Sequence, residues 1–161
     1  MDWLAKFEHC HSLLDDDDEL WLDFSPSAPA TDTDLHSVSV QLPDSYLKYL
    51  RISNGGEIAQ CRFCGTDNLA SAIEMYADLQ DPASFTPFGW DAGGAPFYFG
   101  TDGAVFLAAT KISREVPERL SDSFDEFFGD VMMGAKHPLI YGESFDDDDE
   151  WFGILKKLGW A

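Results

Sequence analysis

The chain has 161 residues, of which 45% are apolar, so it is long enough to bury the core of one domain. Thirty acidic residues against ten Lys and Arg give a formal net charge of −20, which disfavours binding to nucleic acid or an anionic membrane, because their phosphates would be repelled. With no apolar stretch long enough to span a membrane, no basic start of a signal peptide and an odd number of cysteines, we expect a cytoplasmic protein.

The first 41 residues form an acidic N-terminal region. Apolar side chains at helical spacing predict a helix over residues 2–14. The acidic run Asp15–Glu19 and an apolar stretch over residues 20–24 follow. From Ser25 to Asp34 the composition is rich in Pro, Ser, Thr and Asp, which predicts a loop.

The segment LPDSYLKYLRISNGGEI, residues 42–58, is typical of a helix and its end. Pro43 suits the first helical position, and Tyr46 and Leu50 share one helical face. The Asn54-Gly55-Gly56 triplet could instead be a phosphate-binding turn. Such a turn follows a strand and precedes a helix, whereas this triplet follows the predicted helix, so we interpret it as a helix terminator.

The rest of the chain alternates between strand and helix patterns. We expect a strand over Ile58–Phe63, a helix over Leu69–Leu79 and an antiparallel meander over Phe85–Ala109. A capping box, Ser123 to Glu126, predicts a helix through residue 132, and a last apolar stripe predicts a helix over 148–158. This order predicts a single α+β domain, with an antiparallel β-sheet packed by flanking α-helices.

Cys61 and Cys64 have the spacing of half a zinc site or of a redox pair, and His9, Cys10 and His11 could complete a zinc site. Against a site, strand alternation would place Cys61 with Phe63 on one face and Cys64 on the other. We therefore expect no metal there.

The acidic runs Asp15–Glu19 and Asp146–Glu150 lack the turn glycine of a calcium loop, because Leu20 and Trp151 stand at the sixth positions. We interpret the runs as solvated negative patches and helix N-terminal charges. No HExxH or GxSxG pattern is present, so we expect no catalytic residues, no cofactor and no enzyme activity. A hydrolase that uses scattered carboxylates is the outlying alternative.

Three blocks in order, LPDSYLKYLRISNGGEI, FTPFGWDAGGAPFYFGTDGAVFLA and LSDSFDEFF, resemble the SUKH superfamily of Smi1-type regulators and bacterial immunity proteins. The resemblance implies one SUKH-like domain over residues 1–161, with the acidic region 1–41, a family core 42–128 and a C-terminal helical part 129–161. It also implies that function lies in binding rather than catalysis. The matching residues are Leu42, Pro43, Tyr46, Leu50, Asn54, Gly55, Gly56, Gly93, Gly94, Phe97, Tyr98, Gly103, Val105, Ser123, Phe124 and Phe127.

We expect an immunity protein, monomeric or weakly dimeric, that neutralises a cognate basic toxin domain, with a nuclease as the expected class. The alternative is a Smi1-type regulatory or scaffold adaptor with a protein client. Trp21 and Trp151 could anchor a partner inside a charged rim, or could be core residues of their apolar stripes. The expected partner-binding residues are Asp15, Asp16, Asp17, Asp18, Glu19, Asp146, Asp147, Asp148, Asp149 and Glu150.

Overall fold

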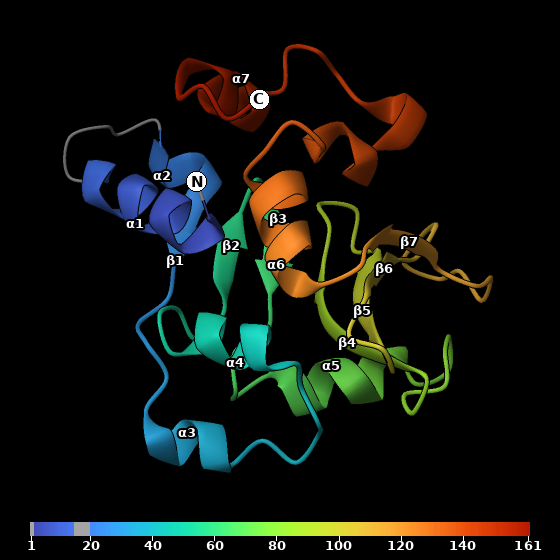
Figure 1. Ribbon diagram of the computed structural model, residues 1–161. Coiled ribbons are helices and arrows are strands. Elements are labelled where there is room, and N and C mark those ends of the chain that lie inside the picture. Colours follow the sequence, from blue (N-terminus) through green and yellow to red (C-terminus); the bar gives the residue numbers. More distant parts are fainter. Residues whose placement is uncertain (1, 15–19) are drawn as a thin grey trace.

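A computed structural model describes residues 2–14 and 20–161, and at Trp21 the backbone alone. The chain forms a single α+β domain around one seven-stranded sheet (Figure 1). Each strand pairs antiparallel with the next in chain order. The strands are β1 (Phe24–Pro26), β2 (Gly56–Ile58), β3 (Cys61–Phe63), β4 (Phe85–Trp90), β5 (Pro96–Gly100), β6 (Val105–Leu107) and β7 (Glu118–Ser121).

The helices precede, interrupt and follow the strands. Asp2 caps the first of them, because its Oδ1 accepts a hydrogen bond from the Ala5 N–H at 2.9 Å. The α-helices are α1 (Trp3–Leu13), α2 (Leu20–Asp23), α3 (Asp32–His36), α4 (Asp44–Leu50), α5 (Leu69–Tyr76), α6 (Phe124–Glu126) and α7 (Glu150–Lys157). A π-helix, η1 (Phe127–Met132), and two 3₁₀ turns, η2 (His137–Ile140) and η3 (Gly142–Ser144), complete the order.

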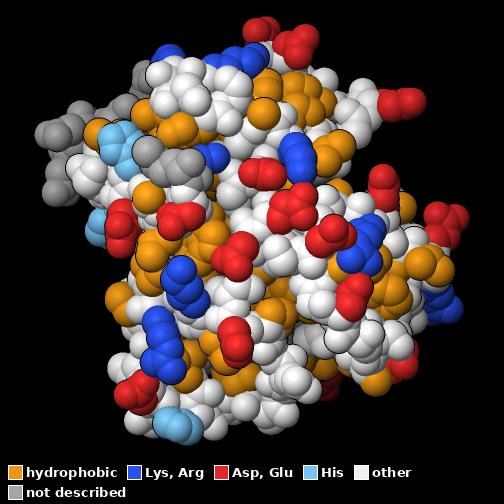
Figure 2. All heavy atoms as spheres, in the orientation of Figure 1, with side chains coloured by type: hydrophobic (Ala, Val, Ile, Leu, Met, Phe, Trp, Pro, Cys, Tyr) orange, Lys and Arg blue, Asp and Glu red, His pale blue; other side chains and the backbone are white. Residues whose placement is uncertain are grey.

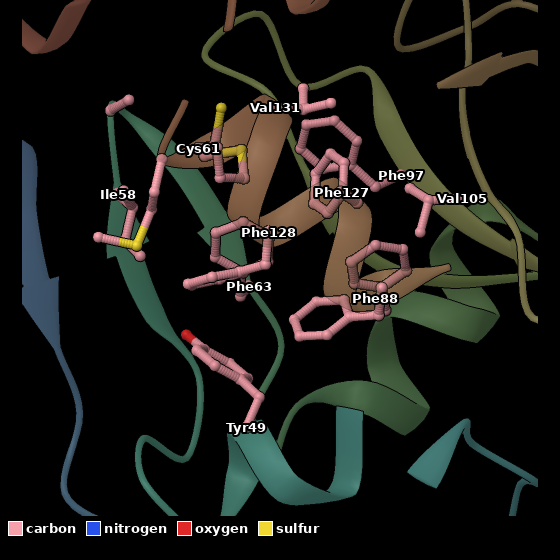
Figure 3. Close-up of a cluster of buried hydrophobic side chains, with 14 of the residues drawn as sticks. Tyr49, Ile58, Cys61, Phe63, Phe88, Phe97, Val105, Phe127, Phe128 and Val131 are labelled. Atoms are coloured by element: carbon pink, nitrogen blue, oxygen red, sulfur yellow. The ribbon is translucent and has the colours of Figure 1, made fainter. Parts of the chain in front are cut away.

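The main core lies between one face of the sheet and the helices α1, α4, α6 and η1. Aromatic side chains dominate it: Phe63 on β3 packs against Phe128 on η1 and Tyr49 on α4, with ring centroids 5.7 and 5.8 Å away (Figure 3). On β5, Phe97 belongs to this core, whereas the neighbouring Tyr98 belongs to a smaller cluster with Tyr76 of α5. The β4–β6 part of the sheet is therefore covered on both faces, with α5 beside the second, whereas Ser25 of β1 and Arg62 of β3 are exposed on the face away from the main core.

Most predicted elements are confirmed, including the helices at both ends, α5 and the meander of β4, β5 and β6. The predicted loop over 25–34 is wrong at its ends, which belong to β1 and α3. A capping box between Thr31 and Asp34 starts α3. The predicted helix after Ser123 is present, but its second part is the π-helix η1 rather than a regular α-helix.

The single strand predicted over Ile58–Phe63 is wrong, because β2 and β3 form a tight hairpin there. Its two turn residues, Ala59 and Gln60, have φ angles of 53° and 62°. That conformation belongs to a turn that usually contains Asn-Gly, and Ala-Gln gives no such signal. Two contacts hold Ala59 in place: its N–H donates to the Asp23 carbonyl at 2.7 Å, and its carbonyl accepts from the Tyr141 hydroxyl at 3.3 Å.

The Asn54-Gly55-Gly56 triplet does not terminate a helix. Helix α4 ends at Leu50, and the two glycines form the turn into β2 with φ angles of 89° and 121°. A Cβ on Gly55 would lie 2.7 Å from the Gly65 nitrogen, so the close approach of the two backbones requires glycine. Asn54 reinforces this contact through two hydrogen bonds to Thr66. The triplet therefore holds the chain before β2 against the chain after β3, at Gly65 and Thr66.

Candidate functional site

Among the described residues, five acidic side chains line a groove of about 450 Å³ between α2 and α7, which we call the acidic groove. Asp23 comes from α2, and Asp147, Asp148, Asp149 and Glu150 come from the second acidic run. Its remaining lining residues are Leu22, Gly153, Ile154 and Lys157. A single lysine therefore faces five carboxyl groups, and the groove has the electrostatic character expected of a site for a cationic partner.

Helix α7 holds this acidic run at the surface. Asp149 caps the helix, because its Oδ1 accepts a hydrogen bond from the Phe152 N–H at 2.7 Å. Trp151 points the other way: its side chain is 1% exposed, and its indole N–H donates to the Met132 carbonyl at 2.7 Å. The ring also stacks on Phe24 at 6.3 Å. The packing of Trp151 into the core fixes α7 to the domain, while Asp147, Asp148 and Glu150 are exposed to solvent.

The opposite side of the groove combines an exposed apolar side chain with a buried acidic one. Leu22 is 74% exposed, whereas Asp23 is only 5% exposed. Burial raises the pKa of Asp23 above its ordinary value, and the negative charges of Glu150 and Asp149 raise it further. The carboxylates of the groove therefore repel one another, and a bound cation would relieve that repulsion.

Behind the groove lies a buried histidine, His137, with its Nε2 atom 3.8 Å from Asp149 Oδ1. Its Nδ1 atom is 3.1 Å from the Val131 carbonyl, and within the described structure Nε2 has no hydrogen-bond partner. Burial lowers the pKa of His137, against the opposing effect of Asp149. The imidazole is therefore neutral near pH 7 and does not cancel the charge of the groove.

The two predicted acidic runs differ in what the structure says of them. The first run, Asp15–Glu19, lies outside the described residues, although the chain places it directly before α2. In the second run, Asp147 to Glu150 line the groove, whereas Asp146 is exposed outside it and accepts a hydrogen bond from the Asp148 N–H.

Trp151 is not a surface anchor, since it is a core residue, and at Trp21 the structure describes the backbone alone. On the α2 side of the groove, the residues that sequence reasoning missed are Leu22 and Asp23. Their available signal was their position within four residues of the end of the first acidic run. Their opposite exposures, however, follow from the packing of α2, which no local pattern reveals.

None of the family-motif residues lines the acidic groove, and most are structural. Tyr46 is buried and its hydroxyl donates to the carbonyls of Cys64 and Phe88, at 2.6 and 3.2 Å. Leu42, Leu50, Phe97, Phe124 and Phe127 are buried in the main core. Gly93 and Gly94 lie in the loop between β4 and β5, where Gly94 has a φ of 85°. These motif residues therefore maintain the fold.

The three cysteines, Cys10, Cys61 and Cys64, are free and buried. Burial raises the pKa of Cys10 and of Cys64 to about 12, and raises that of Cys61 as well, so the thiols stay protonated. As predicted, Cys61 shares a buried face with Phe63; Cys64 is buried just beyond the end of β3. Over residues 2–14 and 20–161, no three His, Cys, Asp or Glu side chains are grouped to hold a metal ion.

Outside the acidic groove, negative charge is spread widely. Figure 2 shows carboxylates distributed over the visible face, among apolar and neutral side chains. Four cations on other parts of the surface, Arg51, Arg62, Arg119 and Lys136, are paired with carboxylates. In the described parts of the chain, no helix combines the length and apolar character that crossing a bilayer requires.

Comparison with known proteins identifies the family. A search of curated proteins gave no match. The family model described as SMI1 / KNR4 family (SUKH-1) matches residues 29–130, which is more than half of the chain. The match includes the α4 helix, the Asn54–Gly56 turn, the β4–β6 meander and most of η1. The chain therefore belongs to the SMI1/KNR4 (SUKH-1) family.

Proposed function

We propose that this protein is a non-enzymatic binding module of the immunity type, which binds and neutralises a cognate basic toxin domain, with a nuclease as the expected class. The observation that carries the proposal is the acidic groove, which is lined by five carboxyl groups and by the exposed side chain of Leu22. The family is consistent with either an immunity-type or a Smi1-like role.

Electrostatics supports a basic partner. A nuclease is cationic where it binds the phosphates of its substrate, so a protein of net charge −20 attracts it over distances of the order of the Debye length, about 10 Å at 0.1 M salt. This attraction raises the rate of encounter and fixes orientation. Binding would also relieve the repulsion around Asp23, whose pKa is raised partly by Glu150 and Asp149. The electrostatic energy of the groove is therefore higher in the free protein than in a complex that places a cation beside it.

The shape of the groove supports a defined contact. Energetically dominant positions in interfaces are apolar or aromatic anchors inside a polar rim that excludes water. Leu22 and Ile154 are the apolar side chains that line the groove, together with the carboxylates of Asp147, Asp148 and Glu150. We therefore expect the stem of an arginine or lysine from the partner to pack on Leu22 while its charged group reaches a carboxylate.

The chemistry of the remaining reactive groups favours binding over catalysis. The cysteine thiols have raised pKa values and are buried, which makes them poor nucleophiles. The imidazole of His137 is fully buried and so is inaccessible to a substrate. The imidazoles of His9, His11 and His36 are within reach of solvent, but none of them lines the acidic groove.

The experiment is a binding and inhibition measurement with the toxin domain encoded by the adjacent reading frame. We expect a stable complex, loss of the toxin's activity on complex formation and an association rate that falls steeply as salt rises. Absence of binding to any neighbouring basic domain would contradict the proposal. An association rate indifferent to salt would contradict the electrostatic mechanism. The Smi1-type adaptor would then be favoured, especially for a gene with no toxin beside it.

A further inference from the structure

A second groove, of about 630 Å³, lies at the end of α5, and we call it the α5 groove. It shares no lining residue with the acidic groove, and α5 lies well away from α7 (Figure 1). Three segments form it: the end of α5 with the residues that follow, the end of β4 with its loop to β5, and the loop from 108 to 117 between β6 and β7.

Apolar side chains dominate the lining of the α5 groove. Met75 is 64% exposed and Ile112 is 75% exposed, while Leu79 and Trp90 are partly buried beside them. Isolated exposed apolar residues are common on protein surfaces. Here, however, Met75 and Ile112, two of the five large apolar side chains that are exposed in the described chain, line the same groove. The floor continues into the smaller core cluster, to which Tyr76 belongs. An apolar side chain inserted here would contact a packed surface.

Hydrogen bonds hold the three walls in place. The Tyr76 hydroxyl donates to the Gly94 carbonyl at 3.1 Å, which fixes the β4–β5 loop to α5. The Gln80 amide donates to the Glu115 carbonyl at 2.7 Å, which fixes the 108–117 loop to the residues after α5. A groove with its walls already tied loses less conformational entropy on binding.

Within the part of the chain that the structure describes, the charged side chains that line the α5 groove are one exposed carboxylate, Asp78, and two cations, Lys111 and Arg114. Neither cation forms an ion pair with any carboxylate in the described parts of the chain, and Lys157, which also forms none, lines the acidic groove. The other cations are engaged: Arg51, Arg62, Arg119 and Lys136 in ion pairs, Lys48 and Lys156 over aromatic rings, and Lys6 with backbone carbonyls. Because these two cations outnumber Asp78 and have no ion-pair partner among the described residues, the lining of the α5 groove favours negative charge on the occupant.

We propose that the α5 groove is a docking site for a segment of another protein that carries carboxylates next to a large apolar side chain. The apolar side chain packs between Met75 and Ile112, and the carboxylates pair with Lys111 and Arg114. A second copy of this chain is a poor occupant, because two molecules of net charge −20 repel each other far more strongly than one such molecule repels a short segment with a few carboxylates. The protein therefore presents two surfaces of opposite chemistry, one for a basic partner and one for an acidic segment.

The test begins with a phage-displayed library of random peptides, roughly 12 residues long, selected on the full-length protein. We expect enriched peptides to combine Asp or Glu with Leu, Phe or Trp. Binding of the best peptide is then measured by fluorescence anisotropy to wild type, to Ile112→Ser and to a Lys111→Gln/Arg114→Gln double variant. We expect each groove variant to weaken binding about tenfold or more.

Two substitutions outside the groove are the matched controls. Val116→Ser removes an apolar side chain that is 83% exposed in the same loop, and Lys48→Gln removes an exposed cation from α4. Both should change affinity by less than about twofold. Because all the substituted side chains are exposed, an amide NMR spectrum should show each variant folded. Failure to enrich peptides, enrichment of basic peptides, equal binding to all variants, or concentration-dependent dimerisation abolished by Ile112→Ser would each overturn the proposal.

Discussion

Replacing Trp151 by alanine tests whether the tryptophan of α7 belongs to the core or to a binding surface. The side chain is 1% exposed, stacks on Phe24 and donates one hydrogen bond to the Met132 carbonyl. Truncating a buried Trp costs about 3–5 kcal/mol, and the carbonyl left without its donor places the value toward the upper part of that range. We expect Trp151→Ala to lower the free energy of unfolding by about 4 kcal/mol.

For a domain of this length, that loss corresponds to a fall in Tm of roughly 8–16 °C. Trp151→Phe separates the contributions, because it keeps an aromatic ring beside Phe24 but removes the indole donor; we expect a loss of about 1–3 kcal/mol. Leu22→Ala is the control on the other side of the acidic groove. Leu22 is 74% exposed, so its truncation should change stability by less than about 0.5 kcal/mol.

The assay is urea unfolding followed by circular dichroism, combined with amide hydrogen exchange. An unchanged denaturant m-value would show that the substitution alters stability rather than the size of the unfolding unit. Hydrogen exchange at residues 150–157 would show whether α7 opens with the sheet or before it. A loss below about 1 kcal/mol for Trp151→Ala, with exchange at α7 unchanged, would refute the assignment of this residue to the core.

Three further predictions concern the hairpin turn and two buried titratable groups. Gln60 is exposed and has a φ of 62°, so in the same urea assay Gln60→Gly should raise the free energy of unfolding by about 0.5 kcal/mol and Gln60→Val should lower it by about 1 kcal/mol. Equal free energies for the two variants would contradict the turn geometry. Because the pKa of His137 is lowered in the folded protein, the unfolded chain takes up the proton first, and wild type should lose stability relative to His137→Asn as the pH falls below 6.5. A stability difference that does not change with pH would contradict the lowered pKa. Because the pKa of Asp23 is raised in the folded protein, Asp23→Asn should be more stable than wild type at pH 7, by a margin that shrinks as the pH falls toward about 4. A margin that grows as the pH falls would contradict the raised pKa.

Local patterns predicted those elements whose side chains repeat regularly. The helix α7 and the meander from β4 to β6 were predictable because their apolar spacing and turn residues agree with the final packing. The β2–β3 hairpin was not predictable, because Ala59 and Gln60 carry no turn signal. Contacts from Asp23 and Tyr141, which are distant in sequence, hold Ala59 in its turn conformation.

The candidate site divides in the same way. The acidic run before α7 was predictable, since four successive aspartates can hardly be buried together. That Leu22 and Asp23 complete a groove with this run depends on how α2 packs beside α7, and that is a tertiary fact. Trp151 lies in the same short stretch as the acids, and only its burial distinguishes a core residue from an anchor.

The most direct test of the central claim compares two sets of three charge-neutralising substitutions for their rate of association with the toxin domain. Asp147→Asn, Asp148→Asn and Glu150→Gln alter the acidic groove, whereas Asp67→Asn, Glu74→Gln and Glu118→Gln remove the same charge from exposed positions outside it. If the acidic groove binds the toxin domain, the association rate of the first triple variant should be at least about tenfold lower than that of wild type, and the rate of the second should lie within about threefold of wild type. Equal rates for the two triple variants would contradict the claim, because binding would then depend on net charge alone.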